Sequence, residues 1–161
     1  MIPSFWYPLN FLNLNDSYKV KAKKAILFKL VDLIIILTLL AASTYVVYRA
    51  YNVSFTHDES LSYKIISGKD IELKKTANHH ILNTKLMKNS MSWFGTSELA
   101  LRLPNVLAFF IFGVFAFLFT KEIKYLWLKI IVIYFLTLNP FLLEYFSLAR
   151  GYGLSLGFLL P

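Results

Sequence analysis

Long apolar runs separated by one polar stretch make up most of the chain. Residues 30–48 are apolar at almost every position, and about 19 residues at ~1.5 Å each match the thickness of a bilayer's hydrocarbon core. A second run covers residues 103–120, and a third starts at Tyr125 and ends before Asn139. A fourth apolar segment, residues 141–160, follows. We therefore predict an all-α, polytopic membrane protein with three to four transmembrane helices.

Lysines flank these runs and predict their orientation. A basic cluster precedes the first run: Lys19, Lys21, Lys23 and Lys24. Under the positive-inside rule this cluster keeps the N-terminus in the cytoplasm, and the two lysines of the turn 121–124 mark the same side again. We expect a cytoplasmic tail at 1–25, a transmembrane helix at 26–48, an outward loop at 49–102 and further transmembrane helices at 103–161, truncated at the C-terminus.

The outward loop contains two segments with amphipathic patterns, residues 60–67 and residues 83–94. Each predicts a short helix on the membrane surface. The second would turn Leu82, Leu86, Trp93 and Phe94 toward lipid, and Lys85 and Lys88 toward headgroups.

Composition agrees with a membrane protein and excludes several other classes. Apolar residues make up 57% of the 161 positions, whereas soluble domains contain about 45–50%. The formal charge of +8 comes from lysines at the ends of apolar runs, not from a basic stripe, so nucleic acid is not an expected partner. The absence of cysteine excludes disulfides and thiolate chemistry.

Ionisable residues beside the apolar runs are the candidates for chemistry. Asp58 and Glu59 follow the first helix, and Arg102 directly precedes the second run. Glu144 and Arg150 lie in the fourth segment, where charges tend to face a bundle interior or a cavity. Arg150 needs an anionic partner, which could be a phosphate or Glu144. On one straight helix these two residues would point to different faces, so each should meet another helix or a ligand. Helix capping by the acidic pair and interfacial anchoring by Arg102 are the simpler alternatives.

A series of motifs in this order resembles the GT-C glycosyltransferases. The motifs are Thr56-His57-Asp58-Glu59, Asn78-His79-His80, Trp93-Phe94-Gly95, Ser97-Glu98, Leu101-Arg102-Leu103-Pro104, Asn139-Pro140, and Glu144 with Ala149-Arg150-Gly151-Tyr152. The chain is most similar to the N-terminal portion of the protein-mannosyltransferase and aminoarabinose-transferase type. The resemblance covers roughly residues 46–157.

This resemblance implies transfer of a hexose or pentose from a polyprenyl-phosphate donor to an acceptor hydroxyl on the outer face of the membrane. Inverting transfer needs a carboxylate that takes the acceptor proton and a positive charge beside the departing phosphate. By match to the family's acidic motif, Asp58 is the expected general base and Glu59 its helper. The expected substrate contacts are Arg102, Arg150, Glu144, His79 and Tyr152.

The chain departs from the family in two respects. His79-His80-Ile81 stands where the family often has His-Pro-Pro, and the family's enzymes carry further membrane helices. The histidines have no H-x-x-x-H spacing, so neither a metal nor another cofactor is expected.

The expected partners are the lipid-linked donor, a protein, lipid or glycan acceptor, and the plasma or inner membrane itself. A rival from another class is a non-catalytic assembly subunit whose loop binds a partner through Trp93. A transporter fragment with Glu144 and Arg150 on an ion path is a third alternative and fits the outward acidic pair less well.

Overall fold

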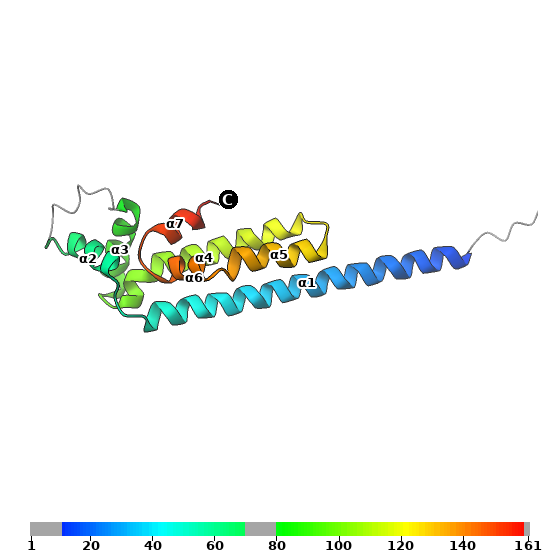
Figure 1. Ribbon diagram of the computed structural model, residues 1–161, viewed down its shortest axis with the longest axis horizontal. Helices are drawn as coiled ribbons and strands as arrows, with labels where there is room; N and C mark the ends of the chain where they lie inside the picture. Colours follow the sequence, from blue (N-terminus) through cyan, green and yellow to red (C-terminus); the bar gives the residue numbers. More distant parts are fainter. Residues whose placement is uncertain (1–10, 70–79, 160–161) are drawn as a thin grey trace, which may run out of the picture. The chain divides into compact units, whose positions relative to one another are not determined.

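The computed structural model describes residues 11–69 and 80–159, with side chains from Tyr18 onward, and within these ranges all regular structure is helical. Figure 1 shows the helices in chain order: α1 (Phe11–Asn52), α2 (His57–Ile66), α3 (Ile81–Phe94), α4 (Glu98–Lys121), α5 (Leu126–Thr137), α6 (Pro140–Ser147) and α7 (Tyr152–Gly157). The predicted all-α class is confirmed.

Two of these helices are long and apolar enough to cross a membrane, namely α4 and the part of α1 from Tyr18 to Asn52. Helices α5 and α6 pass the same test as a pair bent by 44°, which gives up to three spans in the described residues. Helix α1 begins well before the predicted start because neither glycine nor proline interrupts residues 9–67, and lysine and alanine favour helix. Part of the predicted tail is therefore helical.

The chain divides into two compact units, residues 1–34 and 35–161. In the first unit the described residues form the N-terminal part of α1. All packing described below lies in the second unit. Its core joins one side of α1, where Ala42, Val46 and Ala50 recur every fourth residue, to aromatic side chains of α4 and α6. The ring centroids of Phe109 on α4 and Phe146 on α6 are 5.2 Å apart. The small residues of α1 belong to the same buried cluster as these large rings.

Helix α4 is central to the second unit, since it contacts α3, α5, α6 and α7. It contains Pro104, which has no N–H for the carbonyl of Ala100 one turn earlier. The buried Ser90 hydroxyl of α3 donates to this carbonyl instead. A side-chain hydroxyl thus satisfies the group that proline leaves open, and it fixes α3 to the start of α4.

The fourth apolar segment is not the single helix expected from its hydropathy. Asn139 caps α6 by accepting from the N–H of Phe141, and Pro140 occupies the first turn, where proline is favoured. Helix α6 ends at Ser147 because Leu148 is extended, and Gly151 takes a φ of +84° before α7 begins. Hydrophobicity alone does not reveal such a break, since most residues of both helices and of the turn between them are apolar.

Gly153 and Gly157 permit a close approach of α7 to its neighbours, as their small-xxx-small spacing suggests. A Cβ on Gly153 would lie 2.6 Å from the carbonyl oxygen of Tyr145, and one on Gly157 would lie 2.9 Å from the Cβ of Ala108. The helices therefore touch through backbone, which leaves no room for a methyl group.

Replacement of Ser90 by alanine should lower stability by about 1–3 kcal/mol, because the buried carbonyl of Ala100 then lacks a donor. In a Pro104→Ala background the backbone N–H at position 104 can bond that carbonyl, so the same replacement should cost less than about 0.5 kcal/mol. Thermal unfolding of the four proteins in detergent, followed by circular dichroism, measures the coupling. Equal costs in both backgrounds would refute the assigned role of Ser90.

Gly153→Ala should destabilise the chain by about 1–3 kcal/mol, because the added methyl meets backbone that cannot move aside. Gly113→Ala on α4 is the matched control. Its Cβ would lie 3.4 Å from the Leu39 side chain, an ordinary contact, and alanine gains up to ~1 kcal/mol in helix propensity. Opposite shifts of the unfolding midpoint are expected, and shifts of the same sign would contradict this packing.

Candidate functional site

A buried ion pair lies at the centre of the site. Arg102, in the first turns of α4, and Glu59, in the first turn of α2, both have side chains with no exposed surface. The Nε of Arg102 donates to Oε1 of Glu59 over 2.7 Å, and its Nη2 donates to Oε2 over 2.8 Å. This bidentate geometry is the strongest form of a carboxylate–guanidinium pair.

The remaining N–H groups of Arg102 hold the end of α1 and the segment after it. Nη1 donates to the carbonyl oxygens of Ala50 (2.9 Å) and Val53 (2.6 Å), and Nη2 donates to that of Ser54 (3.2 Å). One side chain thus joins α4, α2 and the C-terminus of α1. With every donor of the guanidinium in use, a lipid phosphate would have to displace these acceptors, and the predicted phosphate contact of Arg102 stays a prediction.

Glu59 also caps its own helix, since both the backbone N–H and the hydroxyl of Thr56 donate to Oε2 over 2.9 Å. The capping alternative is therefore confirmed for Glu59, although this residue is buried. Burial by itself would raise the pKa of the Glu59 carboxyl. Hydrogen bonds from Arg102, Ala149 and Thr56, together with the charge of Arg102, outweigh burial and hold the pKa below its usual value.

Both the backbone N–H and the backbone carbonyl of Ala149 are hydrogen-bonded to side chains of other helices. The N–H of Ala149 donates to Oε1 of Glu59 over 2.8 Å, and its carbonyl accepts from Nδ2 of Asn83 over 2.7 Å. The Asn83 amide oxygen in turn accepts from Nδ2 of Asn105 over 2.9 Å. Residues from α2, α3 and α4 thereby fix the backbone immediately before Arg150.

Arg150 extends from this turn to two carboxylates. Its Nε lies 3.6 Å from Oδ2 of Asp58, and its Nη1 lies 3.8 Å from Oε1 of Glu144. Asp58 is exposed and Glu144 is partly exposed, with 58% and 40% of their side-chain surface accessible, whereas Arg150 is at 26%. The Nε itself is buried and has no hydrogen-bond partner, so one directed donor remains open beside Asp58.

The rings of Tyr145 and Tyr152, which are close in sequence to Glu144 and Arg150, pack against each other, and Tyr152 also packs against His80. The ring of Tyr152 lies edge-on to that of His80, with centroids 4.9 Å apart, and is tilted against that of Tyr145 at 5.2 Å. Gly151 is required here for two reasons: its φ of +84° is unfavourable for other residues, and a Cβ would meet His80 at 2.7 Å.

The structure brings Asp58 and Glu144 to Arg150, and it pairs Glu59, the neighbour of Asp58, with Arg102. Tyr152 packs against Tyr145 and His80. His79 lies outside the described residues. The expectation that Glu144 and Arg150 point to different faces was wrong in its premise, because the helix ends between them and the side chains come within 3.8 Å.

Asn83 and Asn105 were missed at the sequence level, although both are fully buried members of the site. Only Asn105 could have been noticed in the sequence, because it is a polar residue directly after Pro104 in an apolar run. Lys129, in the first turn of α5, is also buried and was likewise missed. Within residues 11–69 and 80–159, no group of three or more acidic or histidine side chains is arranged to hold a metal ion, and the expectation that transfer needs no cofactor stays untested.

Comparisons with known proteins leave the chain without an assigned family. No family model, curated protein or solved structure matches it. The resemblance to GT-C glycosyltransferases therefore stays a hypothesis based on motifs.

Acid should destabilise the fold through Glu59. A carboxyl whose pKa is lowered in the folded state contributes stability above its ordinary pKa of 4.5, and this contribution is lost as the pH falls through the lowered value. The unfolding midpoint of the wild-type chain should therefore fall as the pH drops below about 4.5.

Glu59→Gln should be less stable at neutral pH and should lose less on acidification. Exposed Glu122 provides the control, since Glu122→Gln removes an equal charge and should keep the wild-type pH profile. Parallel profiles for wild type and Glu59→Gln would show that Glu59 is not the titrating group.

Proposed function

We propose that this chain forms the outward-facing catalytic part of a membrane glycosyltransferase that uses a polyprenyl-phosphate-linked sugar. The observation that carries the proposal is the approach of an exposed carboxylate, Asp58, to a partly buried guanidinium, Arg150, at 3.6 Å. Inverting glycosyl transfer from a phosphate donor needs both kinds of group, a carboxylate on the acceptor side of the anomeric carbon and a cation on the opposite, leaving-group side. In this proposal the two side chains therefore move apart when the substrates bind between them. Their position near the end of a helix long enough to span a membrane also fits a lipid-linked donor.

In this proposal Asp58 takes the proton of the acceptor hydroxyl while that oxygen attacks the anomeric carbon of the donor. The bond from the anomeric carbon to the acceptor oxygen forms as the bond to the phosphate oxygen breaks. The electron pair of the broken bond stays on the departing polyprenyl phosphate. The proton ends on Asp58, and the sugar configuration inverts.

Arg150 would stabilise the negative charge that develops on the departing phosphate. The Arg150 side chain is 26% exposed, so a phosphate oxygen could approach its guanidinium group and accept a charge-assisted hydrogen bond. Glu144, at 3.8 Å from Nη1, would keep the guanidinium oriented from the other side. Glu59 and Asn83 would act indirectly, by holding the Ala149 peptide groups that present Arg150.

The rival function is that of a non-catalytic assembly subunit. The specific observation in its favour is the exposed aromatic end of α3, where Trp93 and Phe94 have 81% and 59% of their surface accessible. Such residues are enriched in protein interfaces. The two functions differ in whether loss of one carboxylate abolishes transfer without affecting assembly.

Asp58→Asn should lower sugar transfer by about 10²–10⁴-fold, because general-base catalysis contributes about that factor. Membranes from cells that express the full chain would be assayed with radiolabelled polyprenyl-phosphate hexoses and pentoses as donors. Asp58 is exposed, so abundance and thermal unfolding should stay at wild-type values. Glu122→Gln, which removes a charge from an exposed residue at the end of α4, should retain full transfer.

Wild-type transfer by Asp58→Asn would exclude the general-base role. Absence of transfer by the wild-type protein with every donor, together with co-purification of a stable membrane partner, would favour the assembly subunit.

A further inference from the structure

We infer that the groove between α3, α4 and α7 binds one acyl chain of an anionic phospholipid, whose headgroup lies against Lys85. This site is separate from the Asp58–Arg150 cluster and shares no residue with it. The inference does not depend on the proposed transfer reaction.

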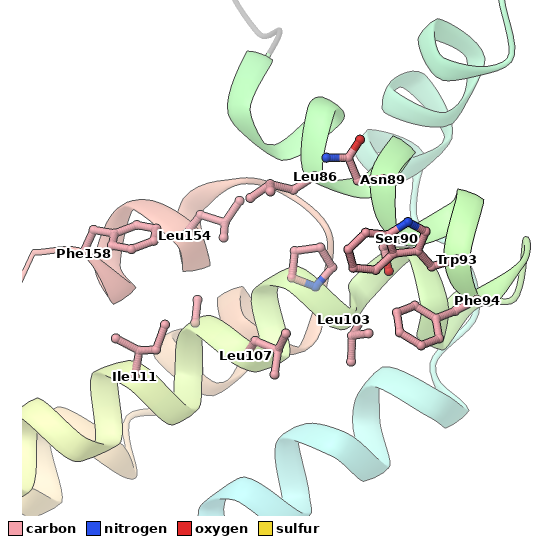
Figure 2. Close-up of a pocket in the computed structure, with 12 residues that line it drawn as sticks. Leu86, Asn89, Ser90, Trp93, Phe94, Leu103, Leu107, Ile111, Leu154 and Phe158 are labelled. Atoms are coloured by element: carbon pink, nitrogen blue, oxygen red, sulfur yellow. The ribbon is translucent and has the colours of Figure 1, made fainter.

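The groove has a volume of about 300 Å³ and an almost entirely apolar lining. Figure 2 shows Leu103, Leu107 and Ile111 of α4 between two walls, with Leu86 and Trp93 of α3 on one side and, on the other, Leu154 of α7 and Phe158 just after its end. Because α4 is long and apolar enough to cross a membrane, a groove along it would be occupied by hydrocarbon and not by water.

The length of the groove fits a single chain of one leaflet. Leu103 and Ile111 both line it and are eight residues apart on α4, so the floor extends about 12 Å at ~1.5 Å per residue. One leaflet contributes about 15 Å of hydrocarbon, half of the ~30 Å core.

Polar groups occur at only one end of the groove. Asn89 and Ser90 line the end near Trp93, whereas Ile111 and Phe158 close the other end. Trp93 is 81% exposed, and tryptophan with one exposed face is typical of the membrane–water interface. The headgroup of a lipid in the groove would therefore lie beside α3.

Charge complementarity selects an anionic headgroup. Lys85 is exposed on α3 and directly precedes Leu86, which lines the groove, and it lies one helical turn before Asn89. Within the described part of α3 there is no acidic residue, and Lys88 adds a second exposed positive charge. A lysine in this position attracts phosphatidylglycerol more strongly than zwitterionic phosphatidylcholine.

The test uses the fluorescence of Trp93 in the full chain. Trp6→Phe and Trp127→Phe would leave Trp93 as the only tryptophan. The protein would be reconstituted in phosphatidylcholine vesicles that contain a small fraction of either phosphatidylglycerol or phosphatidylcholine with brominated acyl chains, which quench tryptophan on contact. The lipid fraction that gives half-maximal quenching should be about fivefold lower for the brominated phosphatidylglycerol.

Two pairs of variants locate the effect. Lys85→Glu should abolish the preference, whereas Lys64→Glu, the same change at an exposed lysine of α2, should leave it intact. Leu107→Phe should weaken quenching by filling the groove, whereas Leu118→Phe should not. Leu107 and Leu118 are both on α4 and both 51% exposed, but only Leu107 lines the groove. Circular dichroism and thermal unfolding check that all variants fold.

Three results would overturn the inference. Equal quenching by both brominated lipids would show unselective contact with the bilayer. Quenching by aqueous acrylamide but by neither lipid would place the groove outside the membrane. Displacement of brominated phosphatidylglycerol by an equimolar amount of polyprenyl phosphate would make an isoprenoid chain the occupant.

Discussion

Arg102 is wholly buried, and a guanidinium in that position needs an acceptor for each of its N–H groups. The chain meets this requirement with one carboxylate and three carbonyl groups, which come from α2 and from the end of α1 and the residues that follow it. The carbonyls that Arg102 binds lie where α1 stops, so they lack partners within a helix. A single charged side chain therefore joins the end of the first membrane-length helix to α2 and α4.

Glu59, which pairs with the buried Arg102, also connects this ion pair to the candidate site. One oxygen of this carboxylate accepts from both Arg102 and Ala149, and the other accepts from Arg102 and Thr56. The Ala149 N–H is available because the chain is not helical there, and a helical segment would have used it internally. The break between α6 and α7 is thus a condition for the buried pair. It also turns Arg150 toward Asp58 and Glu144.

Local sequence signals account for the elements but not for these connections. Hydrophobic runs predicted the helical class and the approximate spans, and the amphipathic pattern near residues 83–94 predicted α3. Arg102, Glu59 and Arg150 were all identified as candidates, yet the pairing of Glu59 with Arg102 joins positions 43 residues apart and depends on tertiary packing. Asn83 and Asn105 could not be assigned, because a buried amide and an exposed one look the same in a sequence. The fourth apolar segment was expected to be one helix for a related reason, because hydropathy indicates burial and not backbone conformation.

Asp58 and Glu59 differ in exposure and in hydrogen bonding because their surroundings differ. Glu59 receives hydrogen bonds from two backbone N–H groups and a guanidinium, so its charge is neutralised and its position is fixed. Asp58 precedes it in the same helical turn, which directs its side chain away from the core and leaves it 58% exposed. Of the two carboxylates, Asp58 is the one that a ligand can reach, whereas Glu59 holds the backbone of Ala149, the residue before Arg150. The acidic pair is therefore best understood as one structural and one accessible carboxylate, and a function that required both to contact a substrate would conflict with the buried ion pair.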